Sequence, residues 1–380
     1  MKKIEKRDVM KIAFAVFLVI SLILVMWQIS LTAFTTYPLQ EKCTDLAPGD
    51  NDFYVDGQNI CGQCSDSNPG TIKKPWCTIQ RALNPGLEPH LQGGQKLYIK
   101  EGIYRFQEDA EIFWITYPLN GAESNPTLIA GYPGEKPKIY MSEKISPWSP
   151  YPNQQDSPIW YFDWAAFIKE NYPNTAEIFI KEKRAKEYMP QIVIVDGNLP
   201  KPLQQVNSRQ TANSFREYAA PYSFRTNQSD MIQGDFYYES DKNSIDYGKL
   251  FVWLPDNSDP NEKNIEVGID KTIWFANINW LVLENLGIHY SGSTAKSSQA
   301  TPLIVNGENN LLKNLEITYN DFTGIAGANC HNCTIRDSKL SFNGNSGSGV
   351  LGNYITYENN TIEGNNWRYY EHGWHCGGLK

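Results

Sequence analysis

A repeat in the last hundred residues constrains the fold of this chain more than any other feature. Four segments share the pattern apolar, polar, Asn or Asp, variable, polar, apolar, and their third positions are spaced by 29, 23 and 22 residues. A period near 22 residues that carries two or three short apolar pieces predicts a coil of stacked β-strands. The third positions of the four segments are Asn285, Asn314, Asp337 and Asn359.

The chemistry of the repeat favours a right-handed parallel β-helix, in which each turn stacks about 4.8 Å above the one before it. Asn side chains that recur at one corner form a structural ladder, because each amide can hydrogen-bond to the next. Gly at the other corners permits backbone angles that other residues avoid. A leucine-rich horseshoe has a comparable period but needs a helix in each repeat. Coincidence between Asn-rich loops is the remaining alternative.

The N-terminus predicts export. Residues 12–31 form an uncharged stretch of twenty residues, which is long enough to cross a bilayer as a helix. Five basic and two acidic residues precede it, so the rest of the chain should face outward. We therefore predict a cytoplasmic basic segment over residues 1–11 and a transmembrane signal-anchor over residues 12–34. A cleaved signal peptide, which would leave the protein secreted, is the alternative.

Charge and composition exclude several kinds of partner. The chain has 34 Lys and Arg against 42 Asp and Glu, a formal net charge of −8. We expect no nucleic-acid partner, because such a partner is held by basic groups that neutralise its phosphates. An acidic protein also repels acidic polysaccharides unless a local basic groove or a bound cation intervenes. Hydrophobic residues make up 41% of the chain, which excludes wholesale disorder.

The cysteines agree with export. Four of the seven are clustered, and in an oxidising compartment they predict two disulfides with three possible pairings. A structural zinc site from the same four is the alternative. Cys330 and Cys333 are expected to be buried thiols, with a metal site that includes Cys376 as the alternative. The four clustered cysteines are Cys43, Cys61, Cys64 and Cys77.

Several motifs in the first half carry a family resemblance. They are NDFYVDG at 51–57, KPWCTIQRAL at 74–83, LYIKEGIY at 97–104 and LIAGYPGEKPKI at 128–139. Together they resemble the N-terminal segment of exported pectate-lyase-like β-helix proteins. The resemblance implies a short helix between Trp76 and Leu83 that closes one end of the coil, with Thr78 at its start.

The middle of the chain interrupts the repeat. Alternating strand patterns separated by Gly, Asp and Pro turns predict an all-β insertion. The order of motifs is similar to that of β-helix glycoside hydrolases related to an α-fucosidase and a xylanase. The predicted parts are a linker over residues 35–51, a cap and first turns over 52–140, the insertion over 141–270, and further turns over 271–380 that continue beyond Lys380.

The resemblance implies a carbohydrate-active protein. Glycoside hydrolysis uses two carboxyl groups, one as acid and one as base or nucleophile. The catalytic candidates are Glu371, Asp321 and Glu308, which lie on irregular stretches between predicted strands, although a solvated loop carboxylate is the simpler interpretation of each. Aromatic and basic residues form a predicted substrate-binding group. Its members are Trp367, Arg368, Tyr369, Tyr370, Trp374 and Lys380.

We therefore predict a single-pass membrane protein whose extracellular part acts on a polysaccharide or glycan, with glycoside hydrolase as the favoured activity. A polysaccharide lyase or epimerase is the first alternative, since Arg368 and Lys380 are available as bases and a Ca²⁺ ion would assist them. A non-catalytic glycan-binding adhesin is the second. No metal and no other cofactor is expected for a hydrolase.

Overall fold

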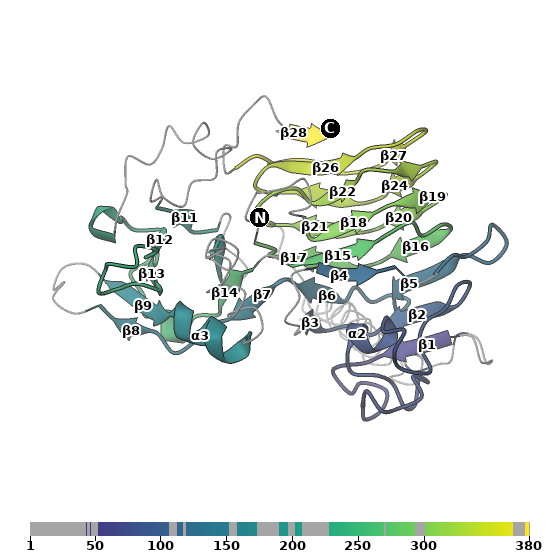
Figure 1. Ribbon diagram of the computed structural model, residues 1–380, viewed down its shortest axis with the longest axis horizontal. Helices are drawn as coiled ribbons and strands as arrows, with labels where there is room; N and C mark the ends of the chain where they lie inside the picture. The colour runs from purple at the N-terminus through teal and green to yellow at the C-terminus, as the bar shows by residue number, and fades with distance from the viewer. Residues whose placement is uncertain are drawn as a thin grey trace, which may run out of the picture. The chain divides into compact units, whose positions relative to one another are not determined.

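The structure is a computed structural model. It describes Cys43, Leu46 and residues 52–105, 112–116, 119–151, 158–172, 190–196, 202–206, 228–269, 271–292, 301–367 and 377–379 (Figure 1). The chain divides into two compact units, Met1–Leu46 and Ala47–Lys380. The predicted transmembrane segment, residues 12–34, lies outside the described residues. Within the described part of the chain, no helix has the length and apolar character needed to cross a membrane.

Three parallel sheets dominate the second unit. The first sheet contains, in order, β1 (Asp52–Val55), β2 (Lys96–Ile99), β5 (Thr127–Gly131), β16 (Leu281–Glu284), β20 (Leu311–Lys313), β24 (Thr334–Arg336) and β27 (Thr356–Glu358). The second contains β3 (Ile103–Arg105), β6 (Lys138–Tyr140), β17 (Gly287–His289), β21 (Glu316–Thr318) and β25 (Lys339–Ser341). The third contains β4 (Ile112–Ile115), β15 (Thr272–Phe275), β18 (Leu303–Val305), β22 (Ile325–Gly327), β26 (Ser346–Val350) and β28 (Gly377–Leu379).

The chain passes through these three sheets in turn, as β16, β17 and β18 show. Strands of successive turns pair in parallel, so they lie one above another in Figure 1. This arrangement is a parallel β-helix with three faces, as the repeat predicts, and its right-handed sense stays a prediction.

Apolar residues of these strands point into the coil and stack on their counterparts in the next turn. These interior residues are at most 4% exposed, and burying each contributes about 1.5–3 kcal/mol. They include Leu283, Leu312 and Ile335 of the first sheet, Ile288, Ile317 and Leu340 of the second, and Ile273, Leu303 and Ile325 of the third.

A short helix closes the N-terminal end of this core, as the resemblance implies. It is α2 (Ile79–Ala82), and the hydroxyl of Thr78 caps it by accepting a hydrogen bond of 3.2 Å from the backbone N–H of Arg81. Trp76, directly before the cap, has no exposed surface and belongs to the same core. The predicted capping helix is confirmed.

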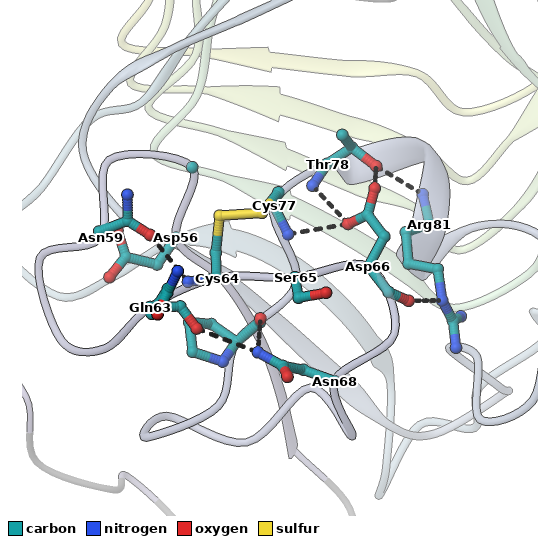
Figure 2. Close-up of a disulfide and its surroundings, with 12 residues drawn as sticks. Asp56, Asn59, Gln63, Cys64, Ser65, Asp66, Asn68, Cys77, Thr78 and Arg81 are labelled. Atoms are coloured by element: carbon teal, nitrogen blue, oxygen red, sulfur yellow. Dashed lines mark hydrogen bonds between the residues drawn. A yellow bond between two sulfur atoms is a disulfide. The ribbon is translucent and has the colours of Figure 1, made fainter.

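A disulfide between Cys64 and Cys77 fixes the loop that leads into α2 (Figure 2). Beside it, the carboxylate of Asp66 accepts hydrogen bonds from the backbone N–H groups of Cys77, at 2.8 Å, and Thr78, at 3.1 Å. The Thr78 hydroxyl donates to the same carboxylate at 2.9 Å. The disulfide and the carboxylate therefore hold the start of the capping helix from two sides.

The cysteines of the cluster form disulfides. Cys43 and Cys61 are each disulfide-bonded too, which rules out a zinc site made of the four. The expectation of buried thiols at Cys330 and Cys333 is wrong, because a disulfide joins them. Asn332, between them, adopts a left-handed backbone conformation with φ of 53°. This turn brings the two α-carbons to 5.7 Å.

The corners of the coil are built differently from the expectation of Gly. All three corners of a turn carry a residue with φ near +57°, and several of these residues are aromatic. An aromatic side chain is costly in this conformation unless its surroundings compensate. The rings of Tyr319 and Phe342 stack at 5.4 Å with 9° between their planes, which offers such compensation. The corner between the second and third sheets holds Tyr290, Tyr319, Phe342 and Gly364, and the corner between the third and first holds Trp280, Asn309, Asn332 and Tyr354.

Between β6 and β15 the chain leaves the three sheets and forms two further sheets with a core of their own. One sheet is antiparallel and contains β10 (Ile192–Val195), β14 (Ile265–Gly268) and β7 (Ser142–Lys144). The other contains β11 (Gln204–Gln205), β12 (Asp235–Tyr238), β13 (Lys249–Trp253), β9 (Ile159–Asp163) and β8 (Ser149–Pro150). The remaining elements are α3 (Trp164–Asn171), the 3₁₀ turns η2 (Gln228–Asp230) and η3 (Pro260–Glu262), and the paired strands β19 (Gly307–Glu308) and β23 (Cys330–His331).

Candidate functional site

The outward-facing side of the third sheet carries a hollow. Because side chains alternate along a strand, the residues next to the interior row point away from the core. Strand register aligns Trp274 with Ile304, Ile304 with Ala326, and Ala326 with Gly349. Side-chain size therefore falls along this outward row from an indole to a hydrogen atom. We call these four residues the outward row.

The hollow lies over this row and has a cavity volume of about 130 Å³. Phe322 and Thr323 line it at the edge where the strands begin, and Asn306 and Leu351 line it at the edge where they end. Leu351 is 47% exposed at the rim, whereas Ile304 is 4% exposed. Since one water needs about 10–15 Å³, the hollow has room for on the order of ten non-hydrogen atoms. That is about the size of one sugar ring.

The lining of the hollow is uncharged. Among the described residues, no Lys, Arg, His, Asp or Glu contributes to its surface. Its polar side chains are those of Asn306 and Thr323. The side-chain oxygen of Asn306 accepts a hydrogen bond of 3.0 Å from the backbone N–H of Ala328, and the Thr323 hydroxyl lies 2.9 Å from that of Ser346. The site thus combines an aromatic wall, an apolar floor and two oriented polar groups, which is the usual composition of a small-molecule pocket.

The structure places two of the three predicted catalytic carboxylates at opposite edges of the third sheet. Asp321 precedes the strand β22 and has no exposed surface, and its backbone N–H donates a hydrogen bond of 2.8 Å to the carbonyl of Ser291. Glu308 is exposed on β19, just after β18, and its backbone N–H donates to the Asn279 side chain at 2.8 Å. Burial disfavours direct contact between Asp321 and a substrate. Glu371 lies outside the described residues.

The predicted substrate-binding group is described at one position. The indole N–H of Trp367 donates a hydrogen bond of 2.9 Å to the backbone carbonyl of Phe342, and its side chain packs against a buried cluster that contains Ile192, Ile194 and Tyr290. These contacts give Trp367 a packing role. The other members, Arg368, Tyr369, Tyr370, Trp374 and Lys380, lie outside the described residues.

The predicted ladder residues share the corner between the first and second sheets, each with φ between 48° and 57°. The side-chain amide of Asn314 donates to the side-chain oxygen of Asn285 at 2.6 Å, and the side-chain amide of Asn359 donates to the carboxylate of Asp337 at 3.3 Å. This corner is a left-handed turn, where Asn and Asp are favoured over other side chains.

A second, buried ladder of Asn side chains was not predicted from the sequence. The Asn320 amide donates to Asn343 at 3.0 Å, and the Asn343 amide donates to Asn365 at 3.3 Å. Their spacing of 23 and 22 residues repeats that of Asn314, Asp337 and Asn359, so the signal was present.

Buried charged groups lie where the insertion leaves the coil. Glu266, 2% exposed, pairs with Arg105 and accepts a hydrogen bond of 2.8 Å from the Ser142 hydroxyl. Lys271 lies 3.2 Å from the carboxylate of Glu143, and burial lowers the pKa of this lysine. These contacts tie β14 and β7 of the insertion to strands of the coil.

The described residues include no group of three or more His, Cys, Asp or Glu side chains arranged to hold a metal ion.

Comparisons with known proteins bear on the fold. No protein-family model matches the chain, and no curated protein matches it. Among solved structures, a complex of XylC with xylose matches with a TM-score of 0.54 at 14% identity, over 86% of this chain and 56% of that one. A glycoside hydrolase matches with a TM-score of 0.52 at 12% identity, over 80% of this chain and 67% of that one.

At such low identity, these two matches show a shared fold. The chain spans little more than half the length of the XylC structure. The expected β-helix fold is thus confirmed. Closer kinship with relatives of an α-fucosidase and a xylanase stays a prediction.

Proposed function

We propose that this protein binds a polysaccharide or glycan in the hollow on the third sheet and hydrolyses it. The observation that carries the proposal is the outward row, with Trp274 as an aromatic wall at one end, Ile304 next to it, and Ala326 and Gly349 leaving free space beyond Ile304. The C–H faces of a pyranose ring are apolar, so they gain free energy by covering an aromatic ring and aliphatic side chains. Ring hydroxyls would meet the polar groups of Asn306 and Thr323.

The fold supports a carbohydrate-active role, since the two structures matched above are described as bound to xylose and as a glycoside hydrolase. Hydrolysis needs two carboxyl groups on either side of the scissile bond. Glu308, exposed at the edge of the third sheet, is one proposed group, and Glu371 is its proposed partner. Asp321 is assigned a supporting role in the wall beside Phe322, because it is buried.

We also propose that the hollow on the third sheet faces the outside of the cell, with the N-terminal segment as a membrane anchor or a cleaved signal. The disulfides Cys64–Cys77 and Cys330–Cys333 support this location, because such bonds persist in oxidising compartments and are rare in the cytosol.

A non-catalytic glycan-binding protein is the second candidate. The observation that favours it is the burial of Asp321, which leaves Glu308 as the single exposed member of the predicted catalytic set among the described residues. Such a protein would use the same hollow without cleaving the glycan.

A polysaccharide panel tests the proposal. Incubation of the purified protein with a panel of neutral and acidic polysaccharides should release reducing ends from at least one of them, without an unsaturated, ultraviolet-absorbing product, which would instead indicate a lyase. Trp274→Ala should raise KM about tenfold, whereas Trp253→Ala, a matched change on the insertion strand β13, should leave KM unchanged. Glu308→Gln and Glu371→Gln should each lower kcat at least about a hundredfold. Binding without any product would support the second candidate, and neither binding nor cleavage would contradict both.

A further inference from the structure

We infer that the hollow on the third sheet accepts a neutral sugar ring and disfavours uronic acids because its described lining holds no cation, and that Ala326 and Gly349 leave the ring its space. The inference rests on the proposed function and names the substrate class of the same site.

The shape of the outward row indicates where a sugar ring has space. The four aligned positions run from Trp274 through Ile304 and Ala326 to Gly349, so the surface steps down along the axis of the coil. A ring placed over Ala326 and Gly349 meets Ile304, and beyond it the indole of Trp274, at one end and finds no side chain beneath it at the other. A β-branched or aromatic residue at either small position would occupy that volume.

The uncharged lining of the hollow disfavours a uronic acid. A uronic acid would bring a carboxylate into a hollow whose described lining holds no cation. Removing an ionised carboxylate from water without a partner is costly, because its hydration is lost and nothing replaces it. The formal net charge of the chain, −8, adds long-range repulsion for a polyanion. A neutral pyranose meets neither obstacle, and its hydroxyls match the oriented groups of Asn306 and Thr323.

The backbone at Gly349 makes this inference testable without unfolding the protein. A β-carbon built there would lie 3.7 Å from the Thr323 methyl group and 4.0 Å from the Ile325 carbonyl oxygen, which are ordinary contacts. At Gly327, by contrast, a β-carbon would lie 2.3 Å from the Val305 carbonyl oxygen. Position 349 can therefore be filled with little cost to stability, whereas position 327 cannot.

The experiment compares affinities by isothermal titration, using neutral hexasaccharides of xylose, glucose, mannose and galactose alongside hexagalacturonate. At least one neutral hexasaccharide should bind, and hexagalacturonate should bind at least about a hundredfold more weakly. Gly349→Ala should weaken the neutral ligand about threefold, and Gly349→Val and Ala326→Val each at least about tenfold. Ile245→Ala, on an exposed side chain of the insertion, should have no effect. Thermal unfolding of each variant verifies that it is folded.

Each outcome has a defined meaning. Tight binding of hexagalacturonate that Gly349→Val abolishes would overturn the inference and leave the proposed function standing. Binding of a neutral ligand that neither valine variant affects would overturn the placement of the ring over Ala326 and Gly349. Absence of binding by every oligosaccharide, neutral or acidic, would contradict the proposed function itself.

Discussion

The amide of Asn320 donates a hydrogen bond of 3.0 Å to the side-chain oxygen of Asn343, one turn further along the coil, and neither residue has any exposed surface. The same oxygen accepts a hydrogen bond of 3.2 Å from the backbone N–H of Asn320, while the Asn343 amide donates to the Ile317 carbonyl at 3.1 Å. A polar side chain thus replaces apolar packing inside the corner, and it binds one turn of the chain to the next.

Replacing this side chain should be costly. Asn343→Ala removes partners from buried polar groups in the neighbouring turns, and each unsatisfied group costs about 1–3 kcal/mol. We expect the free energy of unfolding to fall by about 3 kcal/mol in urea titrations. The control is Asn359→Gly on the outer ladder, the one at the corner between the first and second sheets. Glycine tolerates φ of 57° there, so the free energy of unfolding should change by no more than about 0.5 kcal/mol. Equal losses at the two positions would contradict the distinction between buried and outer ladders.

The insertion should depend on the buried carboxylate of Glu266. Glu266→Gln leaves Arg105 without its charged partner, so we expect a loss of roughly 2–4 kcal/mol of unfolding free energy. The double variant Arg105→Met with Glu266→Leu should recover part of that loss, because it removes both charges together. In a double-mutant cycle of Arg105→Met, Glu266→Leu and the double variant, strictly additive losses would show that the ion pair does not couple the two residues.

Acid should weaken the second sheet through His289. Burial lowers the pKa of this histidine to about 4, although the nearby Glu316 carboxylate opposes the shift. In the unfolded chain its pKa is near 6.5, so the unfolded state binds more protons between these two values. Stability should therefore rise with pH across this window and fall as pH decreases from 6.5 towards 4, by on the order of 3 kcal/mol.

The measurement is the urea midpoint as a function of pH. His289→Gln should flatten the dependence between pH 6.5 and 4, while His331→Gln on the strand β23 should preserve it. Parallel curves for the wild-type protein and His289→Gln would remove His289 as the source.

The disulfide next to the capping helix should stabilise the end of the coil. It closes a loop with a sequence separation of 13 residues, for which chain entropy gives about 3 kcal/mol. Replacing Cys64 and Cys77 together by serine should lower the unfolding free energy by about that amount. The Cys330–Cys333 bond, with a separation of 3, should contribute roughly half as much by the same entropy. An unchanged thermal midpoint after removal of the Cys64–Cys77 disulfide would contradict this account.

Much of the coil could be predicted because the corner between the first and second sheets restricts residue choice. A left-handed backbone at Asn285, Asn314 and Asn359 favours Asn, so the requirement is visible as a repeat. The corner between the second and third sheets could not be predicted, since Tyr319 and Phe342 are poor candidates for φ near 57° when each is considered alone. Their conformation makes sense only once stacking across turns is known.

The hollow was not predicted for a related reason. Ile304, Ala326 and Gly349 are ordinary residues of buried strands, and nothing local indicates which of them point outward. Register and the corner positions decide that, and both are properties of the assembled coil. Asp321 lies on an irregular stretch between strands, which predicts exposure, yet neither Asp321 nor the preceding Asn320 has any exposed surface.

The most direct test of the account is a crystal structure of the protein with the neutral oligosaccharide that binds best in the titration panel. The account predicts a pyranose ring over Ala326 and Gly349, with one face or edge against Trp274 and with hydroxyls near Asn306 and Thr323. A sugar bound on another face of the coil or on the insertion, with the hollow of the third sheet empty, would contradict it.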